Sequence, residues 1–107
     1  MDAQLKRGVL EICVLSAMRN EDTYGYKIIK DLSPFMEVSE STLYPILKRL
    51  ELGGCVTVYS VEHNGRLRKY YRITQVGRER IEEFLLDWDS IMHAYDFIKG
   101  DEKNDKK

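Results

Sequence analysis

The chain has 107 residues, and its 17 basic and 18 acidic side chains leave a formal net charge of −1. A chain of this length forms one domain with a modest hydrophobic core. Because the charges nearly cancel, the sequence excludes a basic field over the whole molecule, and any contact with nucleic acid must come from a local patch of cations. No apolar run approaches the roughly 18 residues of a membrane span, and the first residues lead directly into an amphipathic segment, so we expect a cytoplasmic protein without a membrane partner.

The sequence predicts neither a metal site nor a catalytic site. Cys13 and Cys55 lie far apart among apolar residues, without the close spacing of a zinc or redox pair, so we expect two reduced, buried thiols. His93 follows Asp89 by four residues and precedes Asp96 by three, but ordinary helix surface charge explains this pattern better than a metal site does. No nucleophile with a nearby base can be assembled around either histidine, so we expect no enzyme and no cofactor.

The first predicted helix covers residues 5–18 and is apolar on two sides. Its apolar positions form two stripes: Leu5, Val9, Ile12 and Ser16 in one, and Leu10, Val14, Ala17 and Met18 in the other. A helix that is apolar nearly all round is buried on more than one side. Because the chain is too short to enclose this helix, we expect one stripe to face the subunit's own core and the other to face a second subunit.

Two further helices complete a helix-turn-helix pattern. The second is predicted over residues 24–32, where Ser33-Pro34 ends it. The third has apolar residues at spacings of three and four and is closed by Gly53-Gly54. We expect its regular part to begin at Ser41, with Ser39 and Glu40 leading in, because proline is tolerated only in a first turn and Pro45 must be accommodated. Helix, helix, turn and helix in this order predict a helix-turn-helix.

Hydroxyl groups gather where the third helix begins, on Ser39, Ser41, Thr42 and Tyr44. Hydroxyls and free N–H groups at a helix N-terminus suit phosphate oxygens and base edges, which is how the second helix of a helix-turn-helix meets DNA. The alternative is an ordinary core helix with a good N-cap, since serine and threonine open helices of every kind.

A basic hairpin is predicted after the third helix. Residues 55–61 and 68–74 are rich in β-branched and aromatic side chains, and Asn64-Gly65 between them is a strong hairpin signal. The stretch 59–80 carries only two acidic residues against six basic ones: Arg66, Arg68, Lys69, Arg72, Arg78 and Arg80. One explanation of this excess is that the basic side chains only protect an exposed edge ribbon from aggregation. We prefer contact with DNA, because a wing lies beside a recognition helix.

The last predicted helix begins after the cap Thr74-Gln75-Val76-Gly77 and carries a near-heptad apolar stripe. A stripe that extends far past a small body needs another chain to cover it, so we predict a homodimer. The expected interface consists of Leu5, Val9, Ile81, Leu85, Trp88, Ile91, Met92 and Tyr95. The predicted fold is mainly α (α+β): a winged helix-turn-helix over 1–74, a dimerisation helix over 75–99, and a polar, disordered tail over 100–107.

Several motifs in this order resemble the PadR family of bacterial transcriptional regulators. They are Tyr24-Gly25-Tyr26, Thr42-Leu43-Tyr44-Pro45 with Leu50-Glu51, Arg68-Lys69-Tyr70-Tyr71, and Thr74-x-x-Gly77. The resemblance covers residues 5–98, and the single C-terminal helix is similar to the short subfamily. It implies a homodimeric repressor that binds a palindromic operator in double-stranded DNA.

The expected DNA contacts follow from the winged helix-turn-helix arrangement. We expect contacts to the backbone from the second helix, to the major groove from the third, and to flanking phosphates from the wing. The candidate residues are Tyr24, Tyr26, Lys27, Ser39, Ser41, Thr42, Tyr44, Lys48, Arg66, Arg68, Lys69 and Tyr70. Tyr44 and Tyr70 are also candidates for stacking within the fold. A winged-helix module that binds another protein instead of DNA is the alternative function.

The motif Phe84-x-x-x-Trp88-x-x-Ile91 is similar to the corresponding segment of the lactococcal multidrug-binding repressor of this family. In that protein two symmetry-related tryptophans sandwich flat aromatic drugs at the dimer interface. The resemblance implies that a planar aromatic small molecule binds between the subunits and releases the operator. The candidate effector residues are Ile12, Phe84, Trp88 and Met92, and plain interface packing of the tryptophan is the alternative.

Overall fold

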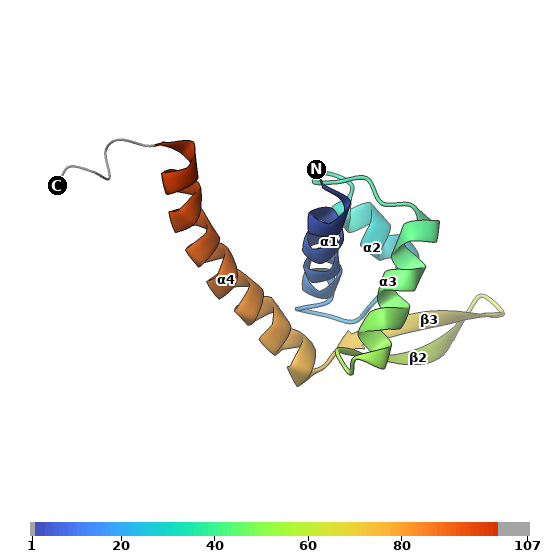
Figure 1. The fold of residues 1–107 in the computed structure, drawn as a ribbon. Coiled ribbons are helices and arrows are strands. Elements are labelled where there is room, and N and C mark those ends of the chain that lie inside the picture. Colours follow the sequence, from blue (N-terminus) through green and yellow to red (C-terminus); the bar gives the residue numbers. More distant parts are fainter. Residues whose placement is uncertain (1, 101–107) are drawn as a thin grey trace.

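The computed structural model describes residues 2–100 and has the predicted winged helix-turn-helix fold. Its elements in chain order are α1 (Ala3–Ala17), β1 (Thr23–Tyr24), α2 (Gly25–Leu32), α3 (Glu40–Leu52), β2 (Val56–His63), β3 (Arg66–Ile73) and α4 (Gln75–Lys99). Figure 1 shows α1, α2 and α3 as one body, from which the β2–β3 hairpin projects on one side and α4 on the other. Of the tail predicted over residues 100–107, Gly100 is the C-cap of α4 and the rest lies outside the described residues.

Helix α1 starts earlier than its apolar pattern predicts because Asp2 caps it. The Asp2 carboxylate accepts hydrogen bonds from the backbone N–H groups of Gln4 and Leu5, both at 3.1 Å, which satisfies two of the free donors at a helix start. The buried residues of this helix are Leu10, Ile12, Val14 and Leu15. Leu5 is exposed and Val9 half-buried, whereas Ile12 is buried, so the stripe of Leu5, Val9, Ile12 and Ser16 is open only toward the helix N-terminus.

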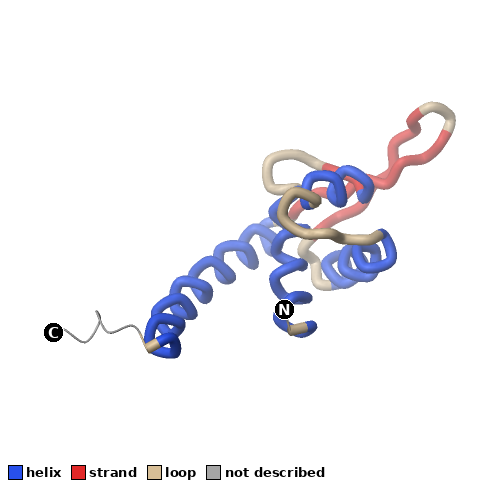
Figure 2. Tube along the Cα trace, turned by 90° about the horizontal axis from the view of Figure 1, so that it is seen from above, coloured by secondary structure: helices blue, strands red, loops and turns tan. Residues whose placement is uncertain are grey.

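Strand β1 was not predicted, and the helix expected from residue 24 begins one residue later. Thr23 and Tyr24 pair with Tyr71 and Tyr70 of β3, so over residues 2–100 the sheet has the order β1-β3-β2. A two-residue strand has no period to detect, and its partner is remote in sequence. Figure 2 shows the strands running from the helical body out into the hairpin.

Helix α3 begins at Glu40, one residue before its predicted start. Ser39 is the N-cap, and its hydroxyl accepts a hydrogen bond from the N–H of Thr42 at 3.3 Å. The prediction that Pro45 lies in the first turn was therefore wrong, since it falls in the second. Proline has no N–H for the carbonyl of Ser41. Both residues are exposed, so water can replace the missing donor.

The hairpin strands are longer than predicted and are joined by Asn64 and Gly65 alone. These residues have φ angles of 54° and 78°, the positive values that a two-residue hairpin turn of type I′ requires. The register pairs His63 with Arg66 at the tip and Val56 with Ile73 at the base. The hairpin signal read from the sequence is confirmed.

The core lies where the three helices meet the base of the sheet. Its most buried large side chains come from α1, α2, α3 and the preceding turns: Leu15, Met18, Ile28, Leu43, Leu47 and Leu50. Each such side chain stabilises the fold by about 1.5–3 kcal/mol relative to exposure. Cys55 is buried as predicted, whereas Cys13 is only half-buried; both are free. Burial raises the pKa of the Cys13 thiol.

Helix α4 joins this core only at its first turns. Thr74 caps it as predicted: its hydroxyl accepts from the N–H of Gly77 at 3.1 Å and donates to the carbonyl of Gly54 at 2.6 Å. Ile81 is 4% exposed and packs in the subunit's own core, so its assignment to the dimer interface was wrong. From Leu85 onward the apolar side chains are exposed. Among the described helices none is long and apolar enough to cross a membrane.

Candidate nucleic-acid interface

The start of α3 presents a cluster of three exposed hydroxyls. The Ser39 hydroxyl lies 3.0 Å from that of Ser41 and donates to that of Thr42 at 3.1 Å. Tyr44 and Lys48, further along the same helix, are also exposed. The structure therefore brings together all five residues predicted for the major groove on one accessible helix. Such hydroxyls can both donate and accept hydrogen bonds, as contact with base edges and phosphates requires.

The predicted residues of α2 differ in how accessible their polar groups are. Tyr26 is exposed, whereas the ammonium group of Lys27 forms an ion pair with Asp31 one turn later, at 2.9 Å. The hydrogen bond that Lys27 donates to Asp31, together with the negative charge of Asp31, raises the pKa of Lys27. Tyr44 reaches from α3 to the first residue of α2, where its hydroxyl end lies against Gly25. The start of α2 and the first half of α3 are thus in direct contact.

One face of the sheet carries a row of tyrosines and arginines. Tyr70 stacks on Tyr59 with ring centroids 5.7 Å apart and meets Tyr24 edge-on at 5.4 Å. The guanidinium carbon of Arg68 lies 4.2 Å from the centroid of the Tyr24 ring, a distance typical of a cation–π contact. Tyr24, Tyr70 and Arg68 therefore form one unit that fixes the wing to the start of α2.

Asp22, just before β1, anchors the same face, and the sequence did not single it out. Its carboxylate accepts a hydrogen bond from the hydroxyl of Tyr59 and another from Arg72 Nε at 3.1 Å. The hydrogen bond from Tyr59, followed by that from Arg72, holds the pKa of Asp22 below its usual value, and the same bond raises the pKa of Tyr59. Arg72 is therefore paired within the fold instead of being a free cation of the wing.

Arg80, like Arg72, is paired within the fold and so is not a free cation of the basic patch that the sequence predicted. It donates to Glu11 of α1 at 3.0 Å, and the same carboxylate accepts two hydrogen bonds from Arg49 of α3, at 2.8 and 3.0 Å. Burial acts to raise the pKa of Glu11, but the hydrogen bonds from Arg49 and Arg80 outweigh it and lower the pKa. One carboxylate thus ties α1, α3 and α4 together, a contact between segments too distant in sequence for any pattern to reveal.

The remaining wing cations are distributed over both faces of the hairpin. The register places Arg66 and Arg68 on one face, and Lys69, opposite Ser60, on the other, because side chains alternate along a strand. Among the ion pairs between described residues, none involves these three cations. Arg66 and Lys69 are exposed, and Arg68 is half-buried against Tyr24.

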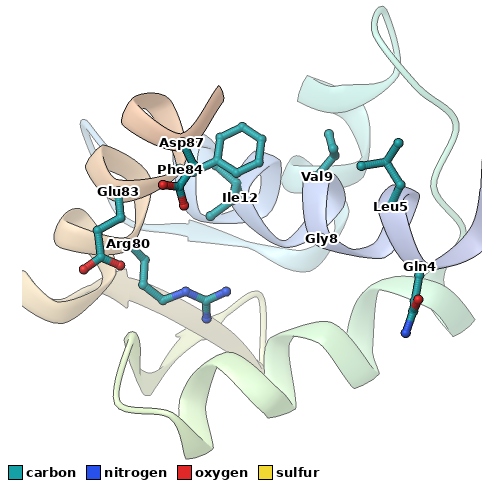
Figure 3. A pocket seen from close by; sticks show the side chains of 9 residues that line it. All are labelled: Gln4, Leu5, Gly8, Val9, Ile12, Arg80, Glu83, Phe84 and Asp87. Carbon is teal, nitrogen blue, oxygen red and sulfur yellow. The ribbon is translucent and has the colours of Figure 1, made fainter. Parts of the chain in front are cut away.

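Two of the four predicted effector residues line the hollow between α1 and α4. Ile12 and Phe84 line a cavity of about 320 Å³ together with Leu5, Val9 and Arg80, as Figure 3 shows. The rings of Phe84 and Trp88 stack with centroids 5.9 Å apart and planes at 16°. Trp88 and Met92 lie farther along α4, are exposed and do not line this cavity, so the structure does not bring the four residues together in one pocket.

The described residues contain no group of three or more His, Cys, Asp or Glu side chains placed to hold a metal ion. His93 instead uses its Nδ1 atom for a contact of 3.0 Å with the backbone carbonyl of Asp89, one turn earlier in α4. The local geometry of this histidine is therefore that of a helix surface residue.

Known proteins share this fold over most of the chain. The family model for the transcriptional regulator PadR-like family matches residues 14–83. An uncharacterised protein of Lysinibacillus sphaericus is 32% identical over 88% of this chain and 92% of its own length. The negative transcriptional regulator PadR of Bacillus subtilis is 28% identical over 73% of this chain and 46% of its own length. The X-ray structure of a PadR-like transcription factor from Bacteroides fragilis has a TM-score of 0.81 and 32% identity, over 90% of this chain and 95% of that one.

An exposed α3 N-terminus beside a basic hairpin, on this fold, defines a winged helix-turn-helix regulator of transcription. The chain belongs to the PadR-like family of transcriptional regulators. Proteins of this family bind DNA and are typically dimeric.

Proposed function

We propose that the protein is a homodimeric repressor that binds a palindromic operator. The observation that carries this proposal is the hydroxyl cluster of Ser39, Ser41 and Thr42 on an accessible helix, together with the exposed wing cations Arg66 and Lys69, which take part in no ion pair between described residues. A helix fits the major groove of B-DNA, and cations beside it hold the phosphates that fix its register. Negative regulation is the activity named for the Bacillus subtilis relative.

The dimer interface is the exposed stripe of α4 together with the open end of α1. The stripe contains five apolar side chains that the subunit does not cover: Leu85, Trp88, Ile91, Met92 and Tyr95. A contiguous row of this size on a small protein marks an interface. Leu5 and Val9 of α1 extend it toward the cavity of Figure 3. A symmetric dimer built on this surface holds two recognition helices for the two halves of a palindrome.

A planar aromatic molecule that binds at Trp88 would act as the effector of this repressor. Phe84 already covers one face of the Trp88 ring, so the opposite face is the one offered to a ligand. Stacking there would gain apolar burial and, for a cationic ligand, an attraction to the ring quadrupole. The ligand releases DNA only to the extent that it prefers the spacing of the free dimer, and a coupling of about 1–3 kcal/mol is typical.

The experiment that tests DNA binding starts from fragments of genomic DNA recovered with the purified protein. Affinity for a recovered duplex should fall steeply as salt rises and should exceed that for unrelated DNA by at least about a thousandfold. A protein that binds every duplex weakly even at low salt would instead be a winged-helix module for a protein partner.

A further inference from the structure

A second hollow lies beside the proposed recognition helix, between α3 and the N-terminal half of α1. It has a volume of about 480 Å³ and is lined by residues of these two helices: Ala3, Lys6, Arg7, Leu10, Ser41, Thr42, Pro45, Ile46 and Arg49. Three of these residues are cations and two carry hydroxyls, and no carboxylate is among the described residues that line it. The hollow is therefore basic, although the chain as a whole is not.

Lys6 and Arg7 are the two cations of this hollow that have no ion-pair partner among the described residues. The charge of Arg49 is met by Glu11 at 2.8 Å. Lys6 and Arg7 are exposed, and the ion pairs between described residues include neither. They also lie in the first two turns of α1, the end of a helix where cations are electrostatically unfavourable. Folding gains nothing from two adjacent cations at this position, so their charge is available to a ligand.

The position of the pair on the fold identifies that ligand as nucleic-acid phosphate. Ser41 and Thr42 belong both to this hollow and to the hydroxyl cluster at the start of α3. A helix about 10–12 Å across fills a major groove about 12 Å wide, so the elements on its two sides face the two phosphate backbones. Figure 1 shows that the hairpin tip projects on the far side of α3 from α1. The wing cations would therefore contact one phosphate backbone of the DNA, and the cations of α1 would contact the other.

We propose that Lys6 and Arg7 bind a phosphate of the operator on the α1 side of the recognition helix. This inference rests on the proposed DNA-binding function and extends its footprint to an element outside the helix-turn-helix and the wing. Because a phosphate contact carries no base information, the pair adds affinity that is nearly independent of sequence. In a dimer each subunit makes the contact once, so both half-sites gain it.

The test compares Lys6→Ala/Arg7→Ala with the matched variant Arg19→Ala/Lys30→Ala. Both remove two exposed positive charges, but Arg19 follows the opposite end of α1, Lys30 lies in the last turn of α2, and neither is among the residues expected to contact DNA. The dissociation constant for a recovered duplex is measured across a series of salt concentrations. The first variant should bind at least tenfold more weakly and lose about two units of the salt slope per dimer, at roughly 0.9 unit per phosphate. The matched variant should keep the wild-type slope.

Three outcomes decide the matter. A wild-type slope in Lys6→Ala/Arg7→Ala, with wild-type DNA binding intact, overturns this inference and leaves the proposed function standing. A wild-type protein that binds no duplex overturns both. Equal losses in the two double variants would show a response to net charge alone and would also overturn the inference. The single variants Lys6→Ala and Arg7→Ala, checked by circular dichroism, give the same comparison should the double variant fold poorly.

Discussion

The hydroxyl end of Tyr44 occupies the space in which a side chain at Gly25 would lie. A Cβ atom built on Gly25 would fall 2.8 Å from the ring carbon Cζ of Tyr44, closer than real Cβ contacts allow, and 3.1 Å from Cε1, which is tighter than most real contacts. Gly25 begins α2 and Tyr44 stands in the first half of α3. The close approach of the two helices of the motif therefore depends on the missing side chain at this position.

Gly25→Ala should destabilise the fold by about 1–3 kcal/mol, the usual cost of overpacking. The cost should largely disappear in a Tyr44→Ala background, because the atoms that clash are then absent. Urea unfolding of the two single variants and the double variant measures this coupling. Additive effects of the two substitutions would mean that the helices separate to make room and that the contact does not set their spacing.

Glu11→Gln should remove part of the acid sensitivity of the fold. Because the folded-state pKa of Glu11 is lowered, its contribution is present above the unfolded pKa of about 4.3 and is lost as pH falls through the folded pKa. We expect the variant to be about 1–3 kcal/mol less stable near pH 7, the value of hydrogen bonds to a charged group. The difference in the free energy of unfolding between wild type and Glu11→Gln should become smaller below pH 4. Glu82→Gln, at an exposed position of α4, is the control.

The recognition helix and the wing should respond differently to substitution. Arg66→Ala/Lys69→Ala should weaken binding to all duplexes nearly equally and reduce the salt slope by about 0.9 unit for each lost phosphate contact. Thr42→Ala or Ser41→Ala should instead change the preference between operator and mismatched duplexes. Binding titrations against both kinds of duplex separate the two effects. An unchanged salt slope in the wing variant would remove these cations from the DNA interface.

Titration of planar dyes and drugs should quench the fluorescence of Trp88, the one tryptophan of the chain. Trp88→Phe has no tryptophan to quench, so binding to this variant is followed by the emission of the dye and should be weaker than binding to the wild type. In the wild type, operator release should occur over the same dye concentrations as the quenching. Compounds that quench without releasing DNA would establish a pocket but no switch. If no compound quenches at millimolar concentration, Trp88 is interface packing only.

Local signals in the sequence predicted most of the fold. Asn64-Gly65 defines the hairpin by its own backbone preference, and Thr74 caps α4 through a contact three residues away. The contacts that organise the candidate site are instead non-local. Glu11 meets Arg49 and Arg80 only after three helices have packed, and no spacing rule applies across such distances. Counting charged residues along the sequence therefore overestimated the number of free cations in the basic patch.

The errors at Pro45 and Ile81 have different physical causes. Periodicity gives the face on which a residue lies, but not how far along that face the subunit's own core extends. The Ser39 cap moved the start of α3 and so displaced Pro45 from the first turn. For Ile81 the extent of the core decides: α4 packs on α1 and β3, which buries Ile81 in the core while the same stripe is exposed from Leu85 onward.

The dimer should dissociate when a charge enters the α4 stripe. Leu85→Asp would bury an unpaired carboxylate against the second subunit, at a cost of several kcal/mol. Glu82→Gln, one turn before it and outside the stripe, is the control. Sedimentation should show a monomer for the first variant and a dimer for the second. A Leu85→Asp variant that remains dimeric at micromolar concentration would place the interface elsewhere.

Sedimentation of the protein with a duplex that it selects from genomic DNA tests the central claim most directly. A homodimeric repressor of a palindromic operator should form a complex of two chains per duplex, and Leu85→Asp should bind the same duplex at least about a hundredfold more weakly because its two half-sites are no longer held together. A wild-type complex of one chain per duplex, or full affinity in the monomeric variant, would contradict the account.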